Sequence, residues 1–241
     1  MMYSRVWPSL LVVSSLIFPS VVRSDDTAPS HSAVTPVPRE GGWLKRHESF
    51  NARVKKGSVD LIFIGDSITQ GWEGSGKGVW EKYYGRRNAV NLGIGGDRTQ
   101  HVLWRLDHGN VDGIAPKVAV VMIGTNNSGT RNTAAEIVDG VKAILTKLRK
   151  KLPQTKILLL DIFPRGQDFN TQRGQILQVN QVLRKLDDGE RVYFHEIGYR
   201  FLEADGSISK EIMPDSLHLS AKGYEIWAAA IEQKLTRLLA R

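Results

Sequence analysis

Residues 59–71 read VDLIFIGDSITQG, a short apolar run that passes directly into glycine, aspartate and serine. A run of this length and composition predicts a buried strand. A serine placed just after such a strand lies on a tight turn into a helix, with its hydroxyl at the edge of the sheet. Ser67 is therefore either an ordinary capping residue or a nucleophile, and the motif alone does not separate the two.

The rest of the chain alternates short apolar runs with segments of helical periodicity. Further strands are predicted at residues 89–92, 118–123, 157–162 and 192–195. The clearest helix covers residues 134–150, where Thr133 and Glu136 form a capping-box pattern and Pro153 follows the end. A last helix is predicted over residues 221–239. Strands that alternate with helices predict a three-layer α/β/α domain around a five-stranded parallel sheet.

The composition of the 241-residue chain excludes several classes of protein. There is no cysteine, which rules out a disulfide framework, a thiol nucleophile and a cysteine-ligated zinc site. Hydrophobic residues make up 41% and charged residues 24%, as in ordinary globular domains, which argues against wholesale disorder. The net charge of +8 favours anionic surfaces only weakly, so we expect no nucleic acid as a partner.

The first 41 residues divide into two segments that we expect to lie outside the folded domain. Residues 1–24 combine a basic start (Arg5), an apolar run too short to cross a bilayer and a small residue (Ser24), as in a signal peptide. An uncleaved N-terminal anchor is the alternative. Residues 25–41 are rich in proline, serine and threonine and predict a flexible or extended linker. The folded domain then covers residues 42–241, and the mature protein is expected to be secreted or periplasmic, without stable membrane insertion.

Glycines and asparagines follow the second and third predicted strands. Residues 92–99 read LGIGGDRT, where glycine N–H groups can approach a ligand closely or simply permit a turn before a helix capped by Thr99. A dinucleotide-binding motif is excluded because Arg98 stands where its third glycine would be. The third strand runs into Gly124-Thr-Asn-Asn127, and such asparagines are either turn formers or amide donors into a crevice.

An aspartate–histidine pair lies between the fifth predicted strand and the last helix. The sequence Asp215-Ser-Leu-His218 allows Asp215 to bond Nδ1 of His218 and leave Nε2 free, although a surface histidine is the simpler interpretation of an isolated pair. Because the carboxyl ends of parallel strands meet at one edge of the sheet, Ser67, the glycine run, Asn126 and this pair should converge there. Together they form a complete hydrolytic set. The other histidines lack metal-ligand spacing, so no metal site is expected.

These blocks together resemble the SGNH or GDSL hydrolase family. Its four motifs match Gly65-Asp66-Ser67, Gly96, Gly124-x-Asn126 and Asp215-x-x-His218, in family order. The longer string NLGIGGDRTQHVLWRL at residues 91–106 looks like the catalytic subunits of the platelet-activating-factor acetylhydrolase branch. Two departures are Ile68, which replaces the leucine that names the family, and Asn127, which replaces an aspartate found in many members and bears on local hydrogen bonding.

The resemblance implies a flavodoxin-like sheet, a catalytic triad and an oxyanion hole, and it implies no cofactor. Ser67 would be the nucleophile, His218 the base and then the acid, and Asp215 the group that fixes the tautomer of His218. The oxyanion hole would consist of the N–H groups of Ser67 and Gly96 and the side-chain amide of Asn126. Family members cleave carboxylic esters, often acetyl esters of lipids or sugars, and some cleave thioesters.

Several readings of the function stay open at this point. A secreted short-chain esterase that acts on acetylated carbohydrates competes with a phospholipid acetylhydrolase, a lysophospholipase and a thioesterase, and export favours the glycan substrate. A non-catalytic glycan-binding module on the same fold and a secreted basic domain that binds an anionic polymer are rivals of another class. Relatives form dimers, so a homodimer is an expected partner state. Trp104 and Arg105 would either line the acyl pocket or pack beneath it, and Asn180 is expected to be a buried amide without a catalytic role.

Overall fold

The computed structural model describes residues 1–3 and 31–240, and its centre is a five-stranded parallel sheet. The strands are β1 (Leu61–Gly65), β2 (Ala89–Gly93), β3 (Val118–Met122), β4 (Lys156–Leu160) and β5 (Val192–His195). Their spatial order is β2-β1-β3-β4-β5, and every neighbouring pair is parallel. The predicted α/β class and five-stranded sheet are confirmed, with strand ends that differ from the predicted ones by at most two residues.

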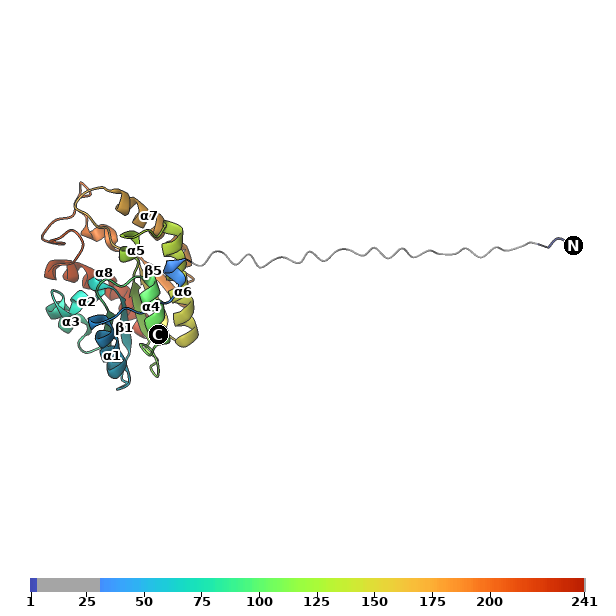
Figure 1. Ribbon diagram of the computed structural model, residues 1–241, viewed down its shortest axis with the longest axis horizontal. Helices are drawn as coiled ribbons and strands as arrows, with labels where there is room; N and C mark the ends of the chain where they lie inside the picture. Colours follow the sequence, from blue (N-terminus) through green and yellow to red (C-terminus); the bar gives the residue numbers. More distant parts are fainter. Residues whose placement is uncertain (4–30, 241) are drawn as a thin grey trace.

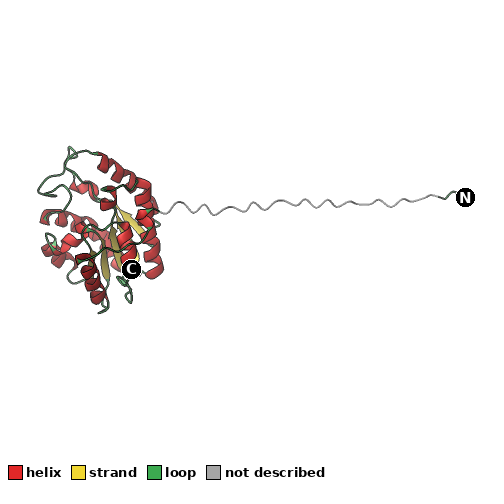
Figure 2. Ribbon diagram, in the orientation of Figure 1, coloured by secondary structure: helices red, strands yellow, loops and turns green. Residues whose placement is uncertain are grey.

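Helices cover both faces of this sheet and form the outer two layers (Figures 1 and 2). One face packs against α1 (Gly42–Val54), α4 (Thr99–Asp107), α6 (Ala134–Lys151) and α7 (Thr171–Leu183). The other packs against α2 (Ser67–Gln70), α3 (Lys77–Tyr84) and α8 (Ala221–Ala240). Alternate side chains of one strand enter different cores: Ile62 and Ile64 face the first group of helices, whereas Leu61 and Phe63 face the second.

Shorter helical turns complete the chain. They are η1 (Ser32–Val34), η2 (Gly71–Glu73), α5 (Thr125–Ser128), η3 (Arg184–Leu186) and η4 (Gly198–Phe201). The predicted capping box of α6 is present, since the Thr133 hydroxyl accepts the N–H of Glu136 and the Glu136 carboxylate accepts the N–H of Thr133. Asn180 is also as predicted: its side chain bonds both the N–H and the carbonyl of Ile162, so α7 holds the loop after β4.

The prediction that the folded part begins near Gly42 is wrong. Residues 31–41 pack on the domain: Ala33 is fully buried, and its carbonyl accepts the hydroxyl of Thr99 at 2.7 Å. Arg39 from the same segment reaches the loop after β2. These residues resemble a linker in composition because Ala33 is their only buried side chain, and polar contacts such as those of Ser32 and Arg39 hold the rest in place. Residues 4–24 of the predicted signal peptide and residues 25–30 of the predicted linker lie outside the described part of the chain.

The order of the strands determines where a site can form. From β1 the chain moves outward to β2 and then returns to the other side of β1 to form β3. The loops that follow β1 and β3 therefore leave the sheet in different directions, and the carboxyl ends of the strands between them are where open parallel sheets bind their ligands. Within the described residues, none of the helices is both long and apolar enough to cross a bilayer.

Candidate active site

Ser67 is the first residue of α2, directly after the central strand β1. The turn is too tight for a side chain at position 65, because a Cβ on Gly65 would lie 2.0 Å from Oγ1 of Thr69 and 2.5 Å from the carbonyl oxygen of Met122. Asp66 caps the helix and accepts the N–H of Ile68 at 2.9 Å. Asp66, and not Ser67, thus provides the cap of this helix, which leaves the hydroxyl of Ser67 available.

The imidazole of His218 lies between Ser67 and Asp215. Its Nε2 is 2.9 Å from Oγ of Ser67, and its Nδ1 is 2.6 Å from Oδ2 of Asp215. The other carboxylate oxygen of Asp215 accepts the backbone N–H groups of Leu217 and His218, and Ser216 adopts a left-handed φ of 59° to allow this turn. The three side chains that the sequence singled out therefore form one hydrogen-bonded line.

The two aspartates near this line have opposite electrostatic environments. Complete burial raises the pKa of Asp66 to about 7, against the opposing effect of the Ile68 N–H. Partial burial alone would raise the pKa of Asp215, but the bonds from the side chain and backbone of His218 outweigh it and the net pKa is lowered. Asp215 is thus an ionised acceptor for His218 at neutral pH, and its side chain is 56% exposed.

The glycine loop after β2 and the turn after β3 meet beside Ser67. A Cβ on Gly95 would lie 3.7 Å from Cβ of Ser67. Gly96 has a left-handed φ of 76°, and the carbonyl of the next residue, Asp97, accepts Nδ2 of Asn126 at 2.9 Å. One N–H of the Asn126 amide is used in this bond and the second meets no acceptor among residues 31–240, so the residue can anchor the loop and still donate a hydrogen bond.

The neighbouring Asn127 has a structural role. It is fully buried, and its Oδ1 accepts the N–H of Thr99 at the start of α4. Its Nδ2 bonds the Thr99 hydroxyl and the side-chain oxygen of Asn132. Arg98 is the N-cap of α4, so the suggested cap at Thr99 is displaced by one residue and the side chain of Asn127 satisfies the first N–H instead.

The helix that follows the glycine loop packs beneath the site rather than lining it. Arg105 is 1% exposed and its Nε donates to Oδ2 of Asp97 at 2.9 Å. Trp104 stacks on the ring of His108 with a centroid distance of 3.7 Å. Of the two alternatives weighed from the sequence, packing therefore holds for Arg105.

Two residues that the sequence did not single out also lie near the site. Arg165, in the loop after β4, donates to the carbonyl of Thr125 at 3.2 Å. Burial lowers its pKa, and the charges of Asp66 and Asp215 oppose this effect. Arg39 donates to the carbonyl of Gly95 at 2.8 Å. Neither has a local sequence signal, because both reach the site from segments that are adjacent only in the fold.

The arrangement has the chemical parts of a hydrolase that uses a covalent intermediate: an alcohol, a base bonded to it, a carboxylate behind the base, and amide donors on adjoining loops. The comparisons with known proteins agree. The model of the GDSL-like lipase/acylhydrolase family matches residues 63–226. The chain belongs to this family. It is a GDSL-type ester hydrolase, and the corresponding prediction from the sequence motifs is confirmed.

Curated and solved relatives of this GDSL hydrolase support the assignment. The chain is 38% identical over 218 residues to the human platelet-activating factor acetylhydrolase IB subunit alpha1, covering 90% of this chain and 93% of that protein. A GDSL-like lipase from Bacteroides thetaiotaomicron has a TM-score of 0.66 at 19% identity, with 80% of this chain and 97% of that chain covered. A variant of an acetyl-xylooligosaccharide esterase from Geobacillus stearmophilus has a TM-score of 0.59 at 19% identity, with 73% and 94% covered. At these identities the two structures show the fold alone.

Proposed function

We propose that this GDSL hydrolase cleaves short-chain carboxylic esters, above all acetyl esters, with Ser67, His218 and Asp215 as its catalytic triad. The observation that carries the proposal is the line from Oγ of Ser67 through the imidazole to the Asp215 carboxylate, with distances of 2.9 and 2.6 Å. A serine hydroxyl is a weak nucleophile at neutral pH unless an adjacent base removes its proton, and His218 is at the distance that this transfer needs.

The first half of the reaction acylates the enzyme. Oγ of Ser67 attacks the ester carbonyl carbon while its proton passes to Nε2 of His218. Asp215 accepts the Nδ1–H, which fixes the tautomer that leaves Nε2 free and stabilises the imidazolium that forms. When the tetrahedral intermediate collapses, the carbon–oxygen bond to the alcohol breaks and His218 gives its proton to the departing alkoxide. An acyl ester on Ser67 remains.

The second half returns the enzyme to its starting state. Water attacks the acyl carbonyl carbon and gives a proton to Nε2 of His218. Collapse of the second tetrahedral intermediate breaks the bond to Oγ of Ser67, which regains the proton, and the carboxylic acid leaves. In both halves the negative oxygen is stabilised by the N–H groups of Ser67 and Gly96 and by the free N–H of the Asn126 amide. Each such donor typically contributes about 10²–10³ in rate.

Acetyl esters are proposed because relatives of two kinds have acetyl in their names. The human relative is called an acetylhydrolase, and the fold relative from Geobacillus is called an acetyl-xylooligosaccharide esterase. The catalytic side chains are also open to solvent: His218 is 46% and Asp215 56% exposed. An open site of this kind suits small acyl groups on bulky alcohols. We propose that the substrate is an acetylated carbohydrate. An acetylated phospholipid is the second candidate, favoured by the name of the human relative.

The decisive experiment is hydrolysis of p-nitrophenyl esters of increasing chain length by the wild type and by Ser67→Ala. We expect the acetate to be the best substrate and the variant to lose about 10⁴–10⁶ in rate while its circular dichroism stays unchanged. Full activity of the folded variant would refute the triad. Parallel assays with acetylated xylo-oligosaccharide and with a phospholipid that carries an acetyl group distinguish the two candidate substrates by the rate at which acetate is released from each.

We further propose that the protein is exported after removal of residues 1–24. The supporting observation is the basic start and short apolar run of that segment. Expression of the full chain in a bacterium with fractionation, followed by N-terminal sequencing of the exported protein, tests this. A protein that keeps Met1 and stays with the cytoplasmic fraction contradicts it.

A further inference from the structure

We propose that Arg39 and Asp97 are positioning residues that orient two donors of the oxyanion hole, the N–H of Gly96 and the amide of Asn126. The inference rests on the proposed function, since it concerns the same site. It gives a role in the reaction to a side chain from residues 31–41, which lie before the region matched by the family model. Three steps lead to this inference: the orientation of one peptide bond, the anchoring of one amide, and the charge of one buried carboxylate.

The first step concerns the peptide bond between Gly95 and Gly96. Nη1 of Arg39 donates to the carbonyl oxygen of Gly95 at 2.8 Å. A trans peptide is planar, so its N–H points in the direction opposite to its carbonyl. When Arg39 holds the carbonyl of Gly95 on one side of the loop, the N–H of Gly96 is directed to the other side. The positive charge at the carbonyl also polarises the peptide and strengthens its N–H as a donor.

Gly96 needs such an external restraint because of its own conformation. Its φ of 76° lies in the left-handed region, which glycine enters and leaves at little cost. The guanidinium of Arg39 also packs closely on this residue: a Cβ at position 96 would lie 3.1 Å from Nη1 of Arg39, so the guanidinium would have to shift by a few tenths of an ångström.

The second step concerns the Asn126 amide. Its Nδ2 donates to the carbonyl oxygen of Asp97 at 2.9 Å, which fixes the plane of the amide group. The same residue, Asp97, holds Arg39, because Oδ1 of Asp97 lies 3.4 Å from Nη1 of Arg39. Asp97 thus connects to one oxyanion donor through its backbone and to the other through Arg39. A movement of Asp97 would disturb both donors together.

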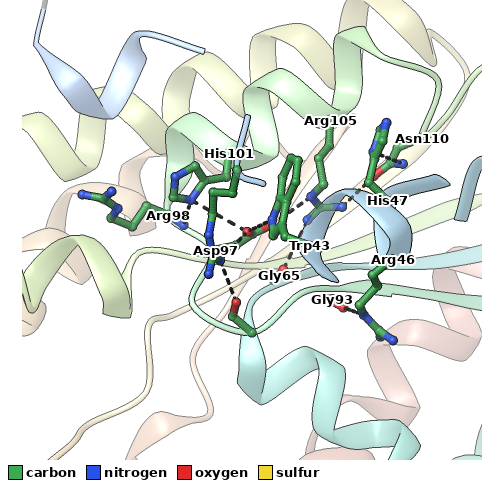
Figure 3. A network of polar contacts seen from close by, with 12 residues as sticks. Trp43, Arg46, His47, Gly65, Gly93, Asp97, Arg98, His101, Arg105 and Asn110 are labelled. Carbon is green, nitrogen blue, oxygen red and sulfur yellow. Dashed lines mark hydrogen bonds and ion pairs between the residues drawn. The ribbon is translucent and has the colours of Figure 1, made fainter. Parts of the chain in front are cut away.

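The third step is the charge of the Asp97 carboxylate, which is completely buried. Figure 3 shows it among the side chains of Trp43, His101 and Arg105. Nε1 of Trp43, from α1, donates to its Oδ1 at 2.6 Å, and Nε of Arg105, from α4, donates to its Oδ2 at 2.9 Å. Burial raises the pKa of Asp97, and the charge of Arg105 and the bond from Trp43 oppose that effect. Every one of these partners is a donor, so the network fits the ionised carboxylate and not the acid.

His101 belongs to this cluster without adding a charge. Its Nδ1 is 3.8 Å from Oδ1 of Asp97, within the range of an ion pair. However, that nitrogen accepts the backbone N–H of Arg98 at 3.0 Å, so it carries no proton to donate. Burial and the nearby arginines lower the pKa of His101 to about 3. The ring is therefore neutral at working pH and packs beside Trp43.

The test separates positioning from general stability by comparing four variants with the full-length wild type. Arg39→Ala is the main variant, because its side chain is 38% exposed and the protein should fold without it. Asp97→Asn keeps the shape but removes the charge. Arg39→Lys keeps a cation and can restore one bond to Gly95. Asp161→Asn is the matched control: Asp161 is a buried carboxylate that bonds the N–H groups of Ile197 and Gly198.

The readouts are kcat and KM for p-nitrophenyl acetate and the inhibition constant of a methyl trifluoromethyl ketone, which forms a tetrahedral oxyanion on Ser67. We expect kcat to fall about 10²-fold in Arg39→Ala and Asp97→Asn, with KM changed less than about threefold, the typical effect of losing an oxyanion donor. The inhibition constant should rise in proportion to the loss of kcat/KM. Arg39→Lys should regain part of the loss, and Asp161→Asn should keep wild-type values of all three constants.

Each other result overturns the inference. These results are an Arg39→Ala enzyme with kcat within twofold of wild type, a loss of kcat without any change in inhibition, or an equal loss in Asp161→Asn. The proposed function fails separately, through an active Ser67→Ala enzyme. An inactive Ser67→Ala beside a fully active Arg39→Ala would preserve the triad and reject only the positioning role. If Asp97→Asn does not fold, Arg39→Ala and Arg39→Lys decide the question alone.

Discussion

Asn127 accepts the backbone N–H of Thr99 through its side-chain oxygen at 3.0 Å, whereas its neighbour Asn126 donates to the carbonyl of Asp97 at 2.9 Å. Two consecutive asparagines thus bind different positions of the loop after β2: Asn126 bonds Asp97 within the loop, and Asn127 bonds Thr99, where the loop ends and α4 begins. Asn127 satisfies the first turn of α4 from a fully buried position. Asn126 is partly exposed, and among the described residues one N–H of its amide has no partner. The pair allows a direct comparison between a proposed oxyanion donor, Asn126, and a residue that maintains the fold, Asn127.

Asn126→Ala should reduce kcat by about 10²–10³ with little change in melting temperature, because an oxyanion donor is lost from an accessible position. Asn127→Ala should lower the melting temperature and change kcat little. The N–H of Thr99 would be left buried without a partner, which costs roughly 1–3 kcal/mol. Urea unfolding and steady-state kinetics on both variants check the two effects. A stable Asn127→Ala, or an Asn126→Ala with unchanged kcat, contradicts the division of roles.

Asp215→Asn should lower kcat by about 10⁴, since an amide in place of the carboxylate favours the wrong tautomer of His218 and leaves the imidazolium without its counter-charge. The bonds from the N–H groups of Leu217 and His218 can be retained by the amide oxygen, so the turn should persist. Asp205→Asn is the control, because Asp205 caps the N–H of Ser207 in an exposed turn of similar geometry. A rate loss below tenfold in Asp215→Asn would remove this residue from the triad.

Gly96→Ala should lose both activity and stability. A left-handed φ of 76° costs an alanine about 1–2 kcal/mol, and the new methyl group would press against the guanidinium of Arg39. The double variant with Arg39→Ala removes the second effect but not the first, so it should regain part of the stability and none of the activity. Differential scanning calorimetry and the acetate assay measure the two quantities. Full recovery in the double variant would mean that backbone strain at position 96 is absent.

His101 should make the protein sensitive to acid. Burial and neighbouring arginines lower its pKa from 6.5 to about 3 in the folded state, so between these values the unfolded chain binds a proton that the folded chain does not. Its contribution to stability is complete above pH 6.5 and is lost as the pH falls towards 3, at about 1.4 kcal/mol for each unit of pH. The free energy of unfolding should therefore decrease on acidification through this window.

The measurement compares the wild type with His101→Gln from pH 4 to 7. Glutamine can still accept the N–H of Arg98 but does not titrate, so the pH dependence of stability should be shallower in the variant. The difference between the two proteins is needed because burial raises the pKa of both Asp66 and Asp161 to about 7. These carboxyls act with the opposite sign and destabilise the folded state as the pH rises from about 4 to 7. Parallel curves for the two proteins would rule out the role of His101.

The fold could be predicted because its signals are local. Each strand consists mostly of apolar residues, with β3 (VAVVM) entirely so, and the capping box of α6 lies within four residues. The side chains of the proposed triad and Asn126 could be placed at one edge of the sheet for a related reason: parallel strands bring their carboxyl ends to one edge, so a residue's place just after a strand indicates where it lies. The pair Asp215 and His218 needs only a spacing of three residues, which the sequence displays directly.

The remaining features depend on contacts between distant segments. Asp97 was visible within the glycine run, but its partners Trp43 and Arg39 come from more than fifty residues earlier, and no periodicity connects them. The start of the folded domain was misplaced for the same reason. A segment with only one buried side chain, Ala33, has the composition of a linker, and its attachment through Thr99 is a contact with a helix that begins far along the chain.

The packing of residues 31–41 has a practical consequence for anyone who shortens this protein. A protein shortened to begin at Gly42, as the composition suggests, lacks two contacts. It loses the buried Ala33, which bonds Thr99 at the start of α4, and the guanidinium of Arg39, which bonds the glycine loop after β2. We expect the shortened enzyme to fold but to have a low kcat. An experimenter could then conclude wrongly that the substrate in the assay was unsuitable. Recombinant versions should begin no later than His31.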